Sequence, residues 1–112
     1  YVLNDDGCES INASSYILGH RNPLVGDTPP IYPVHELPIR KGSWFYIFSD
    51  GICDQFSDTG ERFAKKRVKT TIETFAGKDG KRQQEILLNR LNDWKGKAEQ
   101  TDDILVLGFR PL

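Results

Sequence analysis

Two acidic stretches of the sequence carry the side chains best suited to chemistry. Asp50 and Gly51 come directly after the aromatic run Trp44 to Phe48, and Asp102 and Asp103 stand directly before a second apolar run. Carboxylate oxygens are hard ligands that suit Mg²⁺ or Mn²⁺. Carboxylates held close together repel one another unless a cation lies between them. A metal site is therefore predicted if the fold brings the two stretches together.

The metal hypothesis depends on the strands that carry these carboxylates. Residues 44–48 have the bulky composition of a buried strand, and residues 104–109 also predict a buried strand. If the two strands are antiparallel neighbours, the end of the first and the start of the second lie at the same edge of the sheet. We then expect Asp50 and Asp102 to emerge together. Taken singly, an Asp-Gly pair is also a common turn, and paired aspartates before a strand can be an edge or a cap.

The first part of the chain predicts a hairpin and a long loop. Tyr1 to Leu3 predicts a strand, Asn4 to Gly7 a tight turn and Cys8 to Ile11 the returning strand, because Asp-Gly accepts the positive φ of hairpin turns. Residues 17–31 hold two glycines and three of the six prolines, which predicts an irregular surface loop. His20 lies in that loop without any partner spacing that is typical of a ligand or a base.

The middle of the chain predicts a second hairpin and two helices. Residues 32–39 predict a strand, which includes His35, and residues 40–43 predict a turn into the aromatic strand. Residues 64–76 and 81–95 place apolar side chains at helical spacing, so two amphipathic helices should pack back on the sheet. The solvated face of the first helix is expected to carry a basic cluster, formed by Lys65, Lys66, Arg67 and Lys69.

Composition excludes several classes of protein. The chain has 112 residues, 38% hydrophobic and 28% charged, which suits one small globular domain or part of a larger one. A formal charge of −1 gives no field that would attract nucleic acid or an anionic membrane. No apolar run approaches the roughly 20 residues of a membrane span, and no signal peptide opens the chain. We therefore expect no nucleic-acid partner and no membrane contact by this segment.

The cysteines and the first residue bear on the origin of the chain. Cys8 and Cys53 show no spacing typical of a metal site or a redox motif, which favours reduced thiols in the cytoplasm. The alternative is a single disulfide between them. The sequence begins at Tyr1 and contains no methionine. We expect it to be a piece of a longer protein.

Four motifs in this order resemble the metal-dependent PPM-type serine/threonine protein phosphatases, and within them the bacterial branch named after stage II sporulation protein E. Residues 41–51 resemble that branch's Lys-Gly-Asp, strand and Ser-Asp-Gly. Residues 60–63, followed by a basic helix, resemble its next landmark, and residues 100–104 resemble its terminal Gln-x-Asp-Asp-Ile. Residues 54–56 and 94–96 resemble a subgroup in which the phosphatase domain is the output of a longer bacterial signalling protein.

The resemblance implies a fold and a site. The fold would be α+β, part of an antiparallel β-sandwich flanked by helices, with a two-helix insertion between the last strands. Residues 1–112 would be the C-terminal part of a single phosphatase domain whose N-terminal half is absent. Asp50 and Asp102 would bind metal in a two-metal centre of Mn²⁺ or Mg²⁺, Gly51 would let the backbone turn beside the metal, and Asp103 would support the site.

The resemblance also implies an activity. The parent would hydrolyse phosphoserine or phosphothreonine on a regulatory protein, for example one that controls a sigma factor, with a metal-activated water and no catalytic side chain. The family's first half supplies an aspartate that bridges both metals, and nothing here matches it. This fragment alone is therefore expected to be inactive without the missing N-terminal half or a self-associated copy. The alternative is a degenerate phosphatase fold that acts as a non-catalytic, protein-binding regulator.

Overall fold

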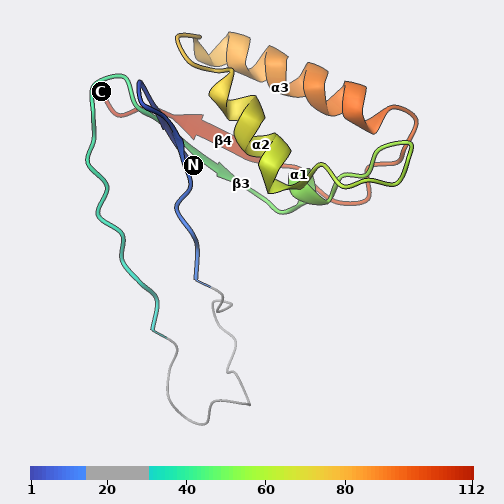
Figure 1. Ribbon diagram of the computed structural model, residues 1–112, viewed down its shortest axis with the longest axis horizontal. Coiled ribbons are helices and arrows are strands. Elements are labelled where there is room, and N and C mark those ends of the chain that lie inside the picture. The colour runs from blue at the N-terminus through green and yellow to red at the C-terminus, as the bar shows by residue number, and fades with distance from the viewer. Residues whose placement is uncertain (15–30) are drawn as a thin grey trace.

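The computed structural model describes residues 1–14 and 31–112. The predicted irregular loop 17–31, with His20, lies outside the described residues except for its last position. The elements occur in the order β1 (Val2–Asn4), β2 (Gly7–Glu9), β3 (Trp44–Phe48), α1 (Gly51–Asp54), α2 (Ala64–Glu73), α3 (Gly80–Lys95) and β4 (Val106–Phe109) (Figure 1).

The strands form one antiparallel sheet in the order β2-β1-β3-β4. The predicted N-terminal hairpin is confirmed, because β1 and β2 pair through a turn at residues 5–6. In that turn the Asn4 side chain accepts a hydrogen bond from the Asp6 backbone N–H at 2.9 Å, and Gly7 adopts a φ of 125°. The turn is thus built from a short polar side chain and from the backbone freedom of glycine.

The predicted strand at residues 32–39 is wrong, because the structure assigns no strand to residues 31–40. Both edges of β3 are already occupied, by β1 and by β4. Pro33 and Pro38 also lack the N–H groups that a ladder needs. The predicted turn is confirmed, because the Ser43 N–H donates to the Arg40 carbonyl oxygen at 3.0 Å, although no strand precedes it. Figure 1 shows this segment extending away from the helices.

The two predicted helices form and cover one face of the sheet. α2 ends at Glu73, three residues before the predicted end, and α3 starts at Gly80, where the Asp79 side chain caps the Arg82 N–H at 2.8 Å. The core packs Tyr46 of β3 against apolar side chains of the helical layer and its connections, which are Ile52, Phe63, Val68, Ile72 and Phe75. No helix in the described ranges has both the length and the apolar character needed to cross a membrane.

No described element covers the opposite face of the sheet, and the predicted burial of residues 104–109 is wrong at positions 105 and 107–109, which are exposed. Directly paired residues of an antiparallel ladder project to the same face. The pairs Phe45↔Phe109 and Ile47↔Leu107 therefore share the face that the helices do not cover. Ile47 is 61% exposed, Leu107 is 53% exposed, and the rings of Phe45 and Phe109 stack at 5.6 Å. We call these four residues the open apolar face.

The α+β prediction is confirmed, with two long helices inserted between the last two strands. The described residues contribute one antiparallel sheet of the expected sandwich, with helices on one side. Both cysteines are free thiols, which decides the question that their spacing left open.

Candidate metal centre

The β3–β4 ladder brings the two acidic stretches to one end of the sheet. Phe48 pairs with Val106, and one step further the Ser49 N–H donates to the Leu105 carbonyl oxygen at 3.0 Å. Asp50 follows this rung on one chain segment, and Asp102 precedes it on the other. The juxtaposition expected from the sequence is therefore present in the fold.

The Ser49 side chain joins the end of β3 to the segment before β4 by two hydrogen bonds. Its hydroxyl donates to the Asp103 carbonyl oxygen at 3.1 Å and accepts from the Leu105 N–H at 3.0 Å. The side chain thus continues the strand pairing across the point where the acidic residues leave the sheet. Ser49 is part of the Ser-Asp-Gly motif, but no separate role was predicted for its side chain.

Gly51 allows a close approach of the backbones. A β-carbon at Gly51 would lie 2.2 Å from the Asp103 carbonyl oxygen and 3.5 Å from the Asp102 Cβ. Gly51 is itself buried at the start of α1. Only glycine fits between α1 and the segment that carries the paired aspartates.

The carboxylates of this end face solvent. Asp50, Asp102 and Asp103 are all exposed. Asp50 is the N-cap residue of α1, yet its side chain makes no capping hydrogen bond. The Asp102 carboxylate accepts the Asp103 N–H at 2.7 Å, which orients it and leaves further lone pairs for a ligand. Two oxygen-rich side chains are therefore presented in a form that suits a hard divalent cation.

The described residues supply only part of a metal site. Within residues 1–14 and 31–112, no group of three or more His, Cys, Asp or Glu side chains could hold a metal ion. Burial raises the pKa of the Cys53 thiol, the nearby Lys65 lowers it, and the negative charges of Asp54 and Asp50 raise it further. The thiol stays protonated near neutral pH and is not a ready ligand. Asp50 and Asp102 fit a divalent cation as an incomplete ligand set.

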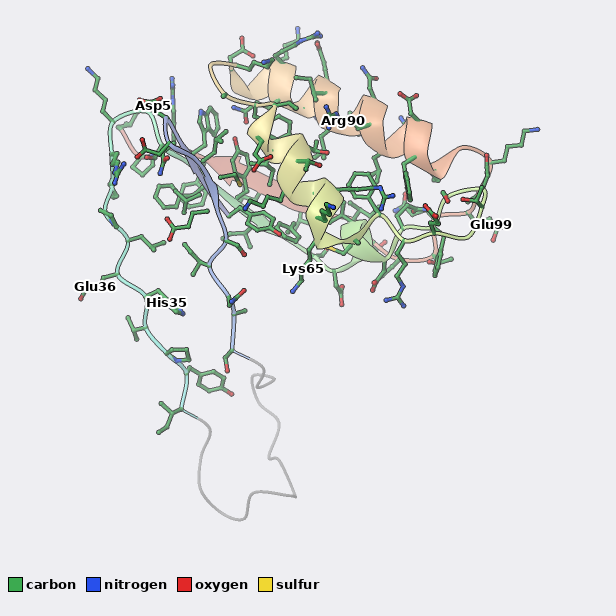
Figure 2. The ribbon with its side chains drawn as sticks, in the orientation of Figure 1. Asp5, His35, Glu36, Lys65, Arg90 and Glu99 are labelled. Carbon is green, nitrogen blue, oxygen red and sulfur yellow. The ribbon has the colours of Figure 1, made fainter. Side chains whose placement is uncertain are left out.

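The other ionisable side chains for which a role was considered lie away from the paired aspartates. Figure 2 shows His35 and Glu36 on the extended segment, far from Glu99, which lies in the connection between α3 and the paired aspartates. The predicted solvated face of α2 is correct for Lys65 and Lys66, which are exposed. Arg67 and Lys69 are only half-buried, and the Arg67 guanidinium lies 3.9 Å from the centre of the Trp94 ring.

One residue near the site was missed by sequence reasoning. Gln55 ends α1 and is only 2% exposed, with its side-chain amide bonded to the backbone that leads to Asp102. Gln55 could have been noticed because it belongs to the motif Asp54-Gln55-Phe56, on which part of the family resemblance rests. A buried glutamine next to a loop is not distinguishable by composition from a solvated one.

Comparison with known proteins gives the family. Residues 2–111 match the family described as Stage II sporulation protein E (SpoIIE). The SiaA-PP2C domain of Pseudomonas aeruginosa is similar in structure, with a TM-score of 0.68 and 30% sequence identity over 72% of this chain and 34% of that chain. No curated protein matches the chain. The chain spans about a third of the length of the SiaA-PP2C chain, and it belongs to the stage II sporulation protein E family of PPM-type phosphatase domains.

Proposed function

We propose that the chain is the C-terminal part of a PPM-type protein-serine/threonine phosphatase domain, the output of a larger bacterial regulator. The parent would hydrolyse phosphoserine or phosphothreonine on a signalling protein. The observation that carries the proposal is the β3–β4 ladder, which delivers Asp50 and Asp102 to the same end of the sheet. The match over residues 2–111 supports the same reading.

The four residues at this end of the sheet would have different roles in a metal site. Asp50 and Asp102 would hold Mn²⁺ or Mg²⁺, Gly51 keeps the two backbones close, and Asp103 orients Asp102 through its N–H. A divalent cation bound there would offset the charge on the phosphoryl oxygens and lower the pKa of a water. The chain's own contribution is to bring two carboxylates to the same solvent-exposed end of the sheet.

The 112 residues alone are proposed to be inactive. Two carboxylates are too few for a two-metal centre, which needs ligands at both ions. The remaining ligands would come from chain outside these residues, in keeping with the 34% share of the SiaA-PP2C chain that is covered.

The open apolar face is proposed to pack against the other sheet of the same phosphatase domain. Its aromatic and aliphatic side chains, Phe45, Ile47, Leu107 and Phe109, are of the kind that sheets bury between them. Among the described residues β4 is an edge strand, and such a strand also leaves backbone groups unpaired. A second copy of this chain on the face is the alternative outcome, and sedimentation of the isolated chain would reveal it as a dimer.

Dephosphorylation assays test the function. A phosphoserine peptide with Mn²⁺ should be turned over by the longer protein and not by the 112-residue chain. Robust turnover by the chain alone would contradict the proposed incompleteness. A longer protein that binds Mn²⁺ but never releases phosphate from such peptides would favour the non-catalytic regulator.

Calorimetry then tests the ligand assignment. Asp50→Asn in the longer protein should weaken Mn²⁺ binding by at least tenfold, since a charged ligand becomes neutral. The matched control is Asp5→Asn, a turn residue at the far end of the sheet (Figure 2), which should leave binding unchanged. Equal Mn²⁺ affinity in the two variants would remove Asp50 from the site.

A further inference from the structure

Gln55 forms a buried link between the two acidic stretches. Its side-chain Nε2 donates to the Glu99 carbonyl oxygen at 3.0 Å and to the Phe56 carbonyl oxygen at 3.0 Å. Both amide hydrogens are thereby used in a site that is 2% exposed. Because the Gln55 side chain is buried, its N–H groups would carry a desolvation penalty if they lost these acceptors, so this link resists being broken.

The Gln55 backbone also forms hydrogen bonds, which connect α1 to α2 and α3. The Gln55 carbonyl oxygen accepts from the Phe63 N–H at 2.9 Å and from the Trp94 indole N–H at 3.3 Å. These bonds join the end of α1 to the start of α2 and to the end of α3. They do not depend on the side chain at position 55, so a substitution there changes only the side-chain bonds to Glu99 and Phe56.

The link acts close to both metal-ligand candidates. Asp50 precedes the four-residue helix α1 that Gln55 ends, and Glu99 lies three residues before Asp102. Between Glu99 and Asp102 every residue is exposed, and the Gln100 side chain bonds only locally, to the Asp102 carbonyl oxygen at 3.0 Å. The segment is thus anchored by Gln55 before Asp102 and by the hydroxyl of Ser49 after it.

We propose that Gln55 is a positioning residue, which sets the place of Asp102 relative to Asp50 by fixing the backbone at Glu99. The role rests on the proposed function, because it concerns the same metal site. Gln55 touches neither metal nor substrate and acts through the segment it holds. Residues that orient ligands in this way commonly change metal affinity 10- to 100-fold when they are replaced.

The test is Gln55→Glu in the longer protein, an almost isosteric change that replaces a donor with an acceptor. An ionised carboxylate facing the Glu99 and Phe56 carbonyl oxygens would repel both. We expect Mn²⁺ affinity, measured by calorimetry near pH 8, to fall by about tenfold. The matched control is Gln83→Glu, because Gln83 is also buried, at 4%, and its side chain bonds Tyr46 and the Lys78 carbonyl oxygen instead. Gln83→Glu should keep the wild-type Mn²⁺ affinity.

A pH series tests the hydrogen bond to Glu99 itself. Burial raises the pKa of a carboxyl group, and once protonated the introduced group can again donate one hydrogen bond to Glu99. The gap in Mn²⁺ affinity between Gln55→Glu and the wild type should therefore narrow as the pH falls from about 8 to about 6. A gap that stays constant or widens would contradict the proposed hydrogen bond.

Hydrogen exchange on the metal-free protein gives a readout that does not need the phosphatase to work. The amides of residues 100–103 should exchange several-fold faster in Gln55→Glu than in the wild type or in Gln83→Glu. Unchanged exchange together with unchanged Mn²⁺ affinity would overturn the proposal. If the wild type binds no Mn²⁺, the proposed function fails, whereas faster exchange at residues 100–103 would still support the anchoring of that segment by Gln55.

Discussion

Gly51 and Asp103 lie in backbone contact, so close that a β-carbon on Gly51 would stand 2.2 Å from the Asp103 carbonyl oxygen. The Gly51→Ala change should therefore push the paired aspartates away from α1. We expect a loss of about 1 to 3 kcal/mol in the free energy of unfolding, as for other overpacked buried sites, and weaker Mn²⁺ binding in the longer protein. Urea unfolding and calorimetry check the two effects.

Gly80→Ala is the matched control for that change. A β-carbon at Gly80 would meet only the edge of the Trp44 ring, at 3.5 Å, which is an ordinary contact. Gly80 begins α3, where alanine loses less backbone entropy on folding than glycine. We expect stability to be unchanged or to rise by up to about 1 kcal/mol. A Gly51→Ala variant as stable as Gly80→Ala would contradict the close packing.

The Arg67 side chain should stabilise the contact between α2 and α3. Its guanidinium lies 3.9 Å from the centre of the Trp94 ring, and its ion pair with Glu61, at 3.6 Å, is exposed. Because the arginine is partly exposed, Arg67→Ala should cost about 1 kcal/mol, mostly through the lost stacking on the ring. The exposed neighbour Lys66 provides the control, and Lys66→Ala should change urea stability by less than about 0.5 kcal/mol.

Leu107 on the open apolar face should respond differently in the short and the long chain. In the 112 residues it is 53% exposed, so Leu107→Lys should hardly change stability and should improve solubility. In the longer protein the same change would bury a charge between two sheets, and we expect a loss of about 3 kcal/mol or more. Equal unfolding free energies for the longer protein and its variant would show that nothing covers this face.

The cysteines should make the protein less stable at alkaline pH. Burial raises the pKa of the Cys8 thiol, with a further rise from Glu73, and burial likewise raises that of Cys53. The folded state then keeps protons that the unfolded chain releases from about pH 8.5 upward. This contribution to stability is complete below that pH and is lost as the pH rises through the folded pKa values. A Cys8→Ala, Cys53→Ala double variant should show a flatter decline of urea stability above pH ~8.5, and an unchanged slope would contradict the assignment.

The local elements were largely predictable. The aromatic strand, the N-terminal hairpin and both helices follow from period, turn residues and caps that lie within a few positions of each other. The ends of the helices shifted by one to three residues, which is common for fraying termini. The prediction of a strand at residues 32–39 was wrong because the composition suits a strand, but both edges of β3 are taken by β1 and β4.

The sequence by itself determined which residues could hold a cation, since Asp50 and Asp102 stand at the ends of strands whatever those strands pair with. Only the tertiary structure decided that β3 and β4 are neighbours, that no described element covers one face of the sheet, and that Gln55 reaches Glu99, 44 positions along the chain. The physical reason is that strand partners and buried side-chain hydrogen bonds join segments distant in sequence. Such long-range contacts produce no periodic pattern of residues in the local sequence, so they could not be predicted from it.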